Sequence, residues 1–392
     1  MNLDFDAGVA TFRAEIAAWL AAHVPAQPLP SVDTAMGFAA HRAFEAELAG
    51  ARLAAVDWPA EYGGRDASLL EWLVFEEEYH AACGPVRVGQ NGLFVLAPTL
   101  LAHGTAEQCA RILPRLARAE DVWAQAWSEP GAGSDLAALR SRAVRTDGGW
   151  LLSGQKTWSS RAVFADRAFG LFRSDTGAGR HHGLTYLMFD LRADGVSIRP
   201  IAQLDGEAGF AEIFLDDVFV SDEDVIGEPG DGWRIAMSSA GHERGLLLRS
   251  PGRFMAAATR LIELWQRIGD PADTALTSRV TDAWIGARAY QLHGYRLASE
   301  SGSAAATDGP ESGATVALAS IGKVFWSELD VELHETALDL LGADAELSAP
   351  DLPDRRWLDG YLFALAGPIY AGTNEIQRSV IAERVLGLPR GN

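Results

Sequence analysis

The spacing of apolar residues changes twice along this chain of 392 residues, and that change limits the possible folds more than any other feature. Up to about residue 121, apolar residues such as Phe12, Ile16 and Leu20 recur at the intervals of a helix with one buried face. Short β-rich runs then replace them as far as about residue 230, after which long helical patterns return. We therefore predict an N-terminal α-helical domain (1–121), a middle β domain (122–230) and a C-terminal helical bundle (231–392).

The middle segment contains short runs rich in β-branched and aromatic residues, at 150–152, 183–189, 196–201 and 211–219. Turn residues at 147–149 (DGG) and 205–206 (DG) separate them, as in hairpins. We expect antiparallel strands that form a barrel-like domain, so the complete chain has an α+β fold.

The helical segments carry their own start and stop signals. Thr105 and Gln108 have the spacing of a capping box, which marks a helix start. In the C-terminal segment we predict the helices of a four-helix bundle over about 233–269, 276–299, 316–341 and 369–386. Pro251 interrupts the first of these, where it predicts either a kink or a helix end.

Composition argues against several classes of function. The formal charge is −20, from 33 Lys and Arg against 53 Asp and Glu, so the average field repels nucleic acid and anionic lipid. Cys83 and Cys109 form no CxxC pattern, which disfavours a disulfide framework and a thiolate metal site. The sequence shows neither a secretory leader nor a run near the roughly 20 apolar residues of a membrane-spanning helix. We expect a cytoplasmic protein with no nucleic-acid or membrane partner.

The first stretch that suggests chemistry is 127–135, which reads WSEPGAGSD. It follows a β-rich run and contains two glycines, so its backbone can approach a ligand closely and present N–H groups to it. Judged on composition alone, an ordinary glycine-rich turn is the more frequent interpretation.

The second stretch is 154–160, which reads GQKTWSS. A flavin needs one group to cover the face of its ring and another to hydrogen-bond its reactive nitrogen, and an indole beside hydroxyls supplies both. Trp158 alone would more often be a core residue.

Together the two stretches resemble the acyl-CoA dehydrogenase family, whose middle domain carries a (T/S)EPGAGSD loop and a GQKxWI(T/S) strand. The resemblance covers nearly the whole chain, because it includes the α, β, α order, DGW at 231–233 and IYAGTNEIQR at 369–378. It implies FAD as cofactor and an acyl-CoA thioester as substrate.

The resemblance also assigns flavin-binding residues in the middle domain. Trp127 and Ser128 would line the pyrimidine side of the flavin, with Gly133 in the same loop. Trp158 and Ser160 would lie against its face and its N5 edge.

The same resemblance assigns residues to the substrate and to the rest of the FAD molecule. Ser134 would approach the phosphopantetheine, and Arg244 is a second candidate substrate-binding residue. Thr373 and Glu375 look like the family residues that touch the FAD phosphates and adenosine, and Arg267 is the candidate for an arginine offered to a neighbouring FAD.

The family's chemistry requires a base that removes the α proton of the thioester while the flavin N5 accepts a hydride from the β carbon. Many members carry this base in a Tyr-Glu-Gly-Thr motif, but here Ala371 occupies the glutamate position. Glu243, in GHERG at 241–245, stands where isovaleryl- and long-chain-type dehydrogenases carry their glutamate, and we predict that it is the base. The alternatives are a solvated helix acid or an ion pair with Arg244.

No metal is expected. His242 and Glu243 begin an HExxH-like pattern, but the second histidine of a zinc site is replaced by Leu246.

Two departures from the family concern partners. Around Arg267 the Arg-x-x-Phe-Gly segment is incomplete, and 339–344 lacks the paired glycines of the second segment that subunits offer to a neighbour's FAD. In VDWPAEYGG at 56–64, KVFWSE at 323–328 and AERVLGLPR at 382–390, the chain resembles the actinobacterial sterol side-chain type, in which two different subunits form a heterotetramer. We expect an oligomer with itself or with a related subunit.

The first hypothesis is therefore an FAD-dependent acyl-CoA dehydrogenase that forms an α,β double bond, acts on a branched or bulky acyl group and passes electrons to an electron-transfer flavoprotein. A dehydrogenase or oxidase of a carrier-bound acyl group, a non-catalytic partner subunit and a flavin-free scaffold remain alternatives.

Overall fold

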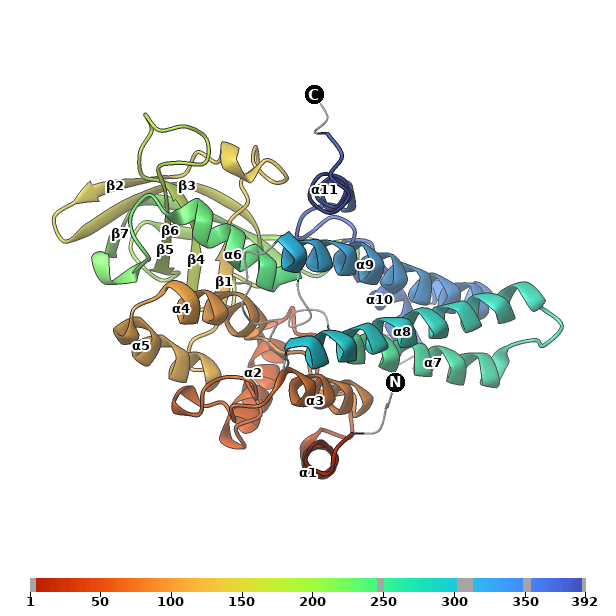
Figure 1. The fold of residues 1–392 in the computed structure, drawn as a ribbon. Helices are drawn as coiled ribbons and strands as arrows, with labels where there is room; N and C mark the ends of the chain where they lie inside the picture. Colours follow the sequence, from red (N-terminus) through yellow and green to blue (C-terminus); the bar gives the residue numbers. More distant parts are fainter. Residues whose placement is uncertain (1–4, 245–249, 302–312, 348–353, 390–392) are drawn as a thin grey trace. The chain divides into compact units, whose positions relative to one another are not determined.

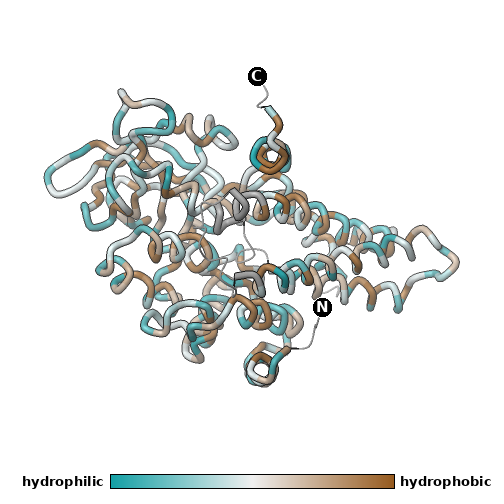
Figure 2. Tube along the Cα trace, viewed as in Figure 1, coloured by the Kyte–Doolittle hydropathy of each residue, from teal (hydrophilic) through white to brown (hydrophobic). Residues whose placement is uncertain are grey.

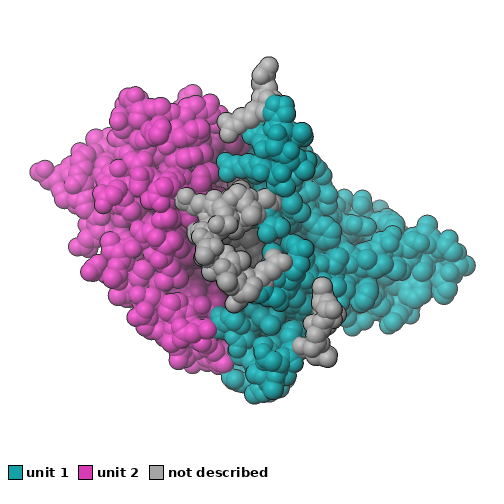
Figure 3. Space-filling view, viewed as in Figure 1, with its two compact units in different colours: residues 1–24, 67–84, 244–392 teal, residues 25–66, 85–243 magenta. Residues whose placement is uncertain are grey.

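The computed structural model describes residues 5–244, 250–301, 313–347 and 354–389 (Figure 1). The chain forms two compact units, coloured separately in Figure 3. Unit 1 comprises 1–24, 67–84 and 244–392, and unit 2 comprises 25–66 and 85–243. Helices from the first third of the chain therefore occur in both units.

Unit 2 is built on one eight-stranded sheet. Its strands are β1 (Trp123–Ala126), β2 (Arg142–Thr146), β3 (Gly149–Ser160), β4 (Arg167–Arg173), β5 (Leu184–Asp190), β6 (Val196–Ile201), β7 (Phe210–Ser221) and β8 (Val225–Ile226). The order is β6-β7-β3-β2-β4-β5-β8, with β1 paired to β4. Most pairs are antiparallel as expected, but β4 runs parallel to β1 and, at one position, to β2. The sheet is therefore mixed, because the long connection through β2 and β3 lets β4 return beside β1 in the same direction.

One hydrophobic core cluster of unit 2 is built largely from residues of this sheet. Trp150, Leu152 and Ile213 are buried there with Phe172 and Phe189, whose rings meet edge to face at 5.9 Å. The alternation that buries Trp150 and Leu152 while leaving Leu151 half-exposed follows the period of a pleated strand.

Helices α2 (Ala35–Gly50), α4 (Ala97–His103), α5 (Ala106–Ala117) and α6 (Gly232–Arg244) complete unit 2, with a π-helical turn η2 (Gly92–Leu96). The predicted capping box at the start of α5 is confirmed, since Thr105 Oγ1 accepts from Gln108 N at 3.2 Å and Gln108 Oε1 accepts from Thr105 N at 3.0 Å. The Gln108 amide also donates to the carbonyl oxygen of Val225 at 2.6 Å, which ties α5 to β8.

Unit 1 is helical. It contains α1 (Ala7–His23), α3 (Leu69–Ala81), α7 (Pro251–Ile268), α8 (Thr274–Ser301), α9 (Gly313–Leu341), α10 (Arg355–Ala364) and α11 (Asn374–Val380), followed by a π turn η6 (Ile381–Val385). Helices α7, α8 and α9 contact one another, and α9 also contacts α10 and α11. Hydrophobic and hydrophilic stretches alternate along these helices, as Figure 2 shows. The bundle core includes Phe254, Tyr290, Trp326 and Leu333.

Two details of the bundle differ from the expectation, and one alternative that the sequence left open is resolved. The segment 233–269 contains two helices, which confirms the helix end and not the kink: α7 begins at Pro251 with Ser250 as its cap, where a missing N–H costs no intrahelical bond. Helix α10 was not predicted. Helix α11 begins only after Ala371, because Ala371 and Gly372 have left-handed φ angles of 54° and 80°.

None of the described helices combines the length and apolarity needed to cross a membrane.

Candidate flavin and substrate site

The two motifs meet through the backbone. The loop 127–135 follows β1, and 154–160 is the end of β3. The N–H of Thr157 donates to the carbonyl oxygen of Ser128 at 2.9 Å, so each motif fixes the position of the other. The fold thus brings the segment of Ser128 next to the segment of Trp158 and Ser160, which begins about thirty residues later in the sequence.

The end of β3 displays an aromatic side chain. The register of β3 against β7 shifts between Lys156 and Ser159, and Trp158 within this bulge has a left-handed φ of 59°. A bulge bends a strand and redirects its side chains, which explains why Trp158 is 59% exposed between the buried Thr157 and Ser159. An exposed indole in a strained conformation is typical of a binding position.

The loop after β1 is a tight turn whose outer edge, the rim formed by Gly131, Gly133 and Ser134, is exposed. Glu129 and Ala132 exchange two backbone hydrogen bonds of 3.1 and 3.0 Å, which close the turn over Pro130 and Gly131. A Cβ atom added to Gly131 or Gly133 would meet nothing within 4 Å. The packing of the described residues therefore does not require glycine at these positions, and the space beside them is open. Ser134, the candidate substrate-binding residue, is exposed on this rim.

A buried ion pair connects the two motifs. Lys156, from the second motif, is fully buried, and its Nζ lies 2.9 Å from Oε1 of Glu129, from the first. The same ammonium donates to the carbonyl oxygen of Leu171 at 2.7 Å. The Glu129 carboxylate also accepts from the backbone N–H groups of Arg140 and Ser141, at 2.6 and 2.9 Å. All these partners belong to unit 2, so the pair joins the loop, β3 and the start of β2.

The pKa values of the pair reflect this environment. Burial alone would raise the pKa of Glu129, but the Lys156 ammonium and the two N–H donors outweigh it and lower that pKa. Burial lowers the pKa of the Lys156 ammonium, and the Glu129 carboxylate opposes this effect. The hydrogen-bond geometry, with acceptors around Nζ, suits the charged form of both groups.

Neither Glu129 nor Lys156 was among the predicted site residues. A signal for Lys156 existed, because Trp150, Leu152 and Lys156 share one face of a period-two strand and the first two are apolar. A lysine on the buried face of a strand requires a buried acidic partner.

The start of α6 is anchored on the sheet. Asp231 forms a bridge with Leu184 of β5, and the N–H of Gly230 donates to Thr185 Oγ1 at 3.1 Å. A Cβ at Gly232 would lie 2.7 Å from the Leu184 carbonyl oxygen, so glycine is needed for this close approach. The backbone of α6 reaches Glu243 and Arg244, the predicted base and substrate residue, whose side chains lie outside the described part of the structure.

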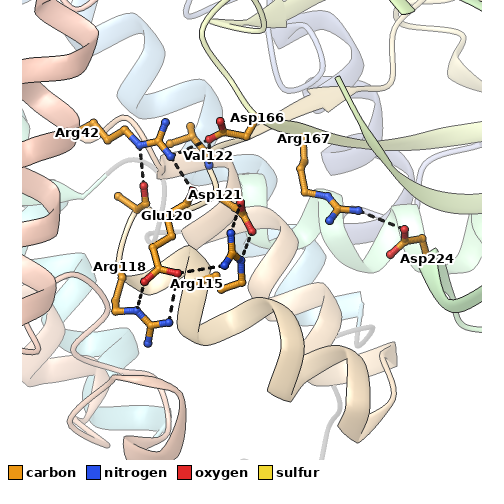
Figure 4. Close-up of polar contacts among 10 residues, drawn as sticks. Arg42, Arg115, Arg118, Glu120, Asp121, Val122, Asp166, Arg167 and Asp224 are labelled. Carbon is orange, nitrogen blue, oxygen red and sulfur yellow. Dashed lines mark hydrogen bonds and ion pairs between the residues drawn. The ribbon is translucent and has the colours of Figure 1, made fainter. Parts of the chain in front are cut away.

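The segment that leads into β1 is held by ion pairs (Figure 4). Asp166 Oδ2 accepts from the N–H of Val122 and from Arg42 Nη2, both at 2.9 Å, and its Oδ1 accepts from Arg192 at 2.6 Å. Arg42 Nε also donates to the carbonyl oxygen of Ala119 at 2.7 Å. Asp166 thereby fixes the entry of the strand that carries the first motif.

The remaining predicted cofactor residues belong to unit 1. Arg267, at the end of α7, donates to both carboxylate oxygens of Asp354 at 2.7 Å. The Thr373 hydroxyl caps α11 by accepting from Ile376 N at 3.3 Å, and Glu375 is exposed in the first turn, where hydrogen bonds from its own backbone and from Thr373 lower its pKa. Each of these three side chains thus has a local structural role, and their contact with FAD stays a prediction.

The residue between Thr373 and Glu375 is buried and was not predicted. Asn374 Oδ1 accepts from Lys323 Nζ at 2.7 Å and from Ser327 Oγ at 3.1 Å. The fully buried Lys323 therefore attaches the start of α11 to α9. Among the described residues, no group of three His, Cys, Asp or Glu side chains is placed to hold a metal ion.

The site fits an isoalloxazine ring on the chemistry of its groups. It offers an exposed indole plane, the half-exposed Ser128 and Ser160 beside it, and a glycine loop with open space in front. Such a set of groups, on a β domain that lies between helical segments in the sequence, is typical of flavin-dependent oxidoreductases.

Comparison with known proteins gives the family. Sequence models described as "Acyl-CoA dehydrogenase" match the chain over 9–120 (N-terminal domain), 124–218 (middle domain) and 230–386 (C-terminal domain). The chain belongs to the acyl-CoA dehydrogenase family, whose members are flavin-dependent oxidoreductases that use FAD.

Curated relatives agree. Acyl-CoA dehydrogenase IpdE1 of Mycobacterium tuberculosis (strain ATCC 25618 / H37Rv) is 39% identical over 389 residues, which are 97% of this chain and 98% of that protein. Acyl-CoA dehydrogenase FadE34 of the same organism is 38% identical over 347 residues, which are 88% of this chain and 46% of that protein.

Solved structures share the fold. The Tcur3481-Tcur3483 steroid ACAD superposes with a TM-score of 0.84 at 25% identity, and the ChsE4-ChsE5 complex from Mycobacterium tuberculosis with 0.85 at 28%, each over 100% of both chains. Both are named for two components. The predicted α+β fold and the resemblance to the sterol-type family are confirmed.

Proposed function

We propose that this chain forms an α,β double bond in an acyl-CoA thioester, with Glu243 as the base that removes the α proton. The observation that carries the proposal is the junction of Ser128 with Thr157, which joins the two motif loops beside the exposed indole of Trp158. Bound FAD supplies the hydride acceptor for the β carbon in this chemistry.

Other residues of the chain bind the flavin, the substrate and the phosphate part of FAD in this proposal. Trp158 covers one face of the ring, while Ser128 and Ser160 hydrogen-bond its polar edge and Gly133 leaves room for it. Ser134 orients the thioester arm, and Arg244 assists in binding substrate. Thr373, Glu375 and Arg267 contribute to holding the phosphate and adenosine part.

Glu243 is proposed because the other position at which family members carry the catalytic glutamate has no acidic residue here. Ala371 stands there, in a left-handed backbone conformation. Burial of a carboxylate from water raises its pKa, and a base whose pKa lies nearer the operating pH is suited to proton abstraction next to a carbonyl.

Relatives named for a steroid and for two components support a proposal on the substrate class and the assembly. We propose a bulky, steroid-like acyl thioester, an assembly with a related subunit, and an electron-transfer flavoprotein as acceptor. A fully flavinated homo-oligomer of the chain expressed alone, measured by light scattering and flavin quantitation, would count against the unlike subunit.

The test is anaerobic flavin reduction by a panel of short, long, branched and steroid-like acyl-CoA thioesters, with Glu243→Gln beside the wild type. We expect the substitution to slow reduction by about 10²–10⁴-fold, the usual contribution of a general base. Glu228→Gln, which removes an exposed acid from the same unit, is the control and should be silent. Full reduction in Glu243→Gln would refute the assignment.

One observation favours a second candidate, a non-catalytic subunit that completes the flavin site of a partner. It is Ala371, which removes the acid that many relatives carry. In that case Glu243→Gln leaves turnover of the assembled complex unchanged.

A further inference from the structure

A chain of buried hydrogen bonds connects the first motif to helix α6. Trp127 Nε1 lies 3.2 Å from the Tyr186 hydroxyl oxygen, which lies 3.4 Å from Ser239 Oγ. Ser239 Oγ is hydrogen-bonded to Thr99 Oγ1, which donates to the carbonyl oxygen of Val95 at 2.7 Å. All five residues belong to unit 2, and they come from the loop after β1, from β5, from α6, from α4 and from η2.

These contacts fix the direction of every donor. The Thr99 hydrogen points to the Val95 carbonyl, so Ser239 donates to Thr99. The Ser239 hydrogen is then used, so Tyr186 donates to Ser239 and accepts from the indole N–H of Trp127. The chain has one consistent order of donors and ends on a backbone carbonyl.

Burial makes this order costly to break. Thr99, Tyr186 and Ser239 are fully buried, and Trp127 is 8% exposed. A buried hydroxyl or indole N–H that loses its partner keeps its full desolvation cost, about 1–3 kcal/mol. The Tyr186 ring is also held by Phe169, stacked at 6.2 Å, and by the edge of Trp127 at 6.1 Å. The chain is therefore complete only when α6 occupies one axial position against the sheet.

Ser239 and Glu243 are four residues apart on α6, so these two positions share one face of the helix and are one turn apart. Ser239 thus sets the height and rotation of the turn that carries position 243. At the other end, Trp127 adjoins Ser128, whose carbonyl oxygen holds the second motif.

We infer that Tyr186 and Ser239 are positioning residues that set the register of the base helix α6 against the flavin loop at Trp127. This inference rests on the proposed function for its catalytic consequence. The hydrogen-bonded link between Trp127 and α6 does not depend on the proposed function, because all its contacts lie within this chain.

The test compares Ser239→Ala with Ser238→Ala in the purified full-length protein. Ser238 is the matched control, because it is the neighbouring residue on α6 and is buried, and its Oγ has no hydrogen-bond partner among the described residues. Tyr186→Phe removes the central hydroxyl, and Ser239→Thr keeps a hydroxyl at the end of the chain.

The first readout is backbone hydrogen exchange of α6 and of 127–135 without substrate. We expect Ser239→Ala and Tyr186→Phe to accelerate exchange in both segments by at least about threefold, and Ser238→Ala to leave both unchanged. Equal acceleration in Ser238→Ala, or acceleration in one segment only, would overturn the link.

The second readout is the rate of flavin reduction by the best thioester. We expect kcat to fall about ten- to a hundredfold in Ser239→Ala at nearly constant KM and flavin content, with recovery in Ser239→Thr. In the Glu243→Gln background Ser239→Ala should have no further effect, because both changes act on one step. A loss confined to KM, or full additivity, would reject the positioning role. If the wild type reduces no flavin with any thioester, the proposed function fails while hydrogen exchange still decides the link.

Discussion

The ammonium nitrogen of Lys156 lies 2.9 Å from a carboxylate oxygen of Glu129 in a part of the β domain where neither side chain is more than 8% exposed. The two charges come from the two motifs that define the candidate flavin site. Their pairing explains how two loops distant in sequence are held in one geometry.

Lys156→Met should lower the free energy of unfolding by about 3–5 kcal/mol, because it leaves the Glu129 carboxylate buried without its cation. Denaturant unfolding followed by intrinsic fluorescence measures this loss. The double variant Lys156→Met/Glu129→Gln should lose less than the sum of the single variants. Arg145→Met, which breaks the exposed pair with Asp222, is the control and should not shift the midpoint. Additive losses would show that the pair is not coupled.

Trp158→Gly should separate stability from cofactor binding. Trp158 is 59% exposed and has a φ of 59°, so glycine removes a strained conformation and little buried surface. We expect stability to stay equal or rise by up to about 1 kcal/mol, while retained FAD decreases. Cys83→Gly, at an exposed position with a φ of 56° in unit 1, is the control and should leave the flavin content unchanged. Unaltered flavin content in Trp158→Gly would remove the indole from the site.

Stability should fall on mild acidification because of two buried histidines. Burial lowers the pKa of His41 and of His334 below the ordinary value near 6.5. Both rings are therefore neutral in the fold at a pH where the unfolded chain already binds protons, so stability rises with pH through this window and is lost as pH falls from about 6.5 through the folded pKa. Thermal unfolding at pH 7.5, 6.5 and 5.5 measures the slope.

The histidine variants provide the check on that slope. His41→Asn and His334→Asn should each reduce the decrease in Tm between pH 7.5 and 5.5, whereas His181→Asn, at an exposed position, should not. An identical slope in all three variants would assign the acid sensitivity to carboxylates instead.

Asp166→Asn should destabilise unit 2 by about 1–3 kcal/mol, because Arg42 and the Val122 N–H lose a charged acceptor in a buried position (Figure 4). Glu120→Gln is the control, since Glu120 pairs with Arg115 and Arg118 at the surface. Chemical denaturation measures both variants. Hydrogen exchange of β1 should rise only in Asp166→Asn; unchanged β1 would mean that the strand entry is held by other contacts.

Much of the fold and the identity of the two motifs could be predicted from local order along the chain. The capping box at Thr105 depends on residues three apart, and the change of period marks helical and β segments without any long-range contact. The parallel pairing of β4 with β1 could not be predicted in this way, because it depends on which distant strand returns beside which.

The sequence alone determined the order of the helical and β segments, the family and the two motifs that form the candidate flavin site, since periodicity and contiguous motifs are local properties of the chain. Only the tertiary structure decided that Lys156 neutralises Glu129, and that Tyr186 links Trp127 to Ser239. Such contacts join residues tens of positions apart, and their strength comes from exclusion of water, which exists only after the chain has packed.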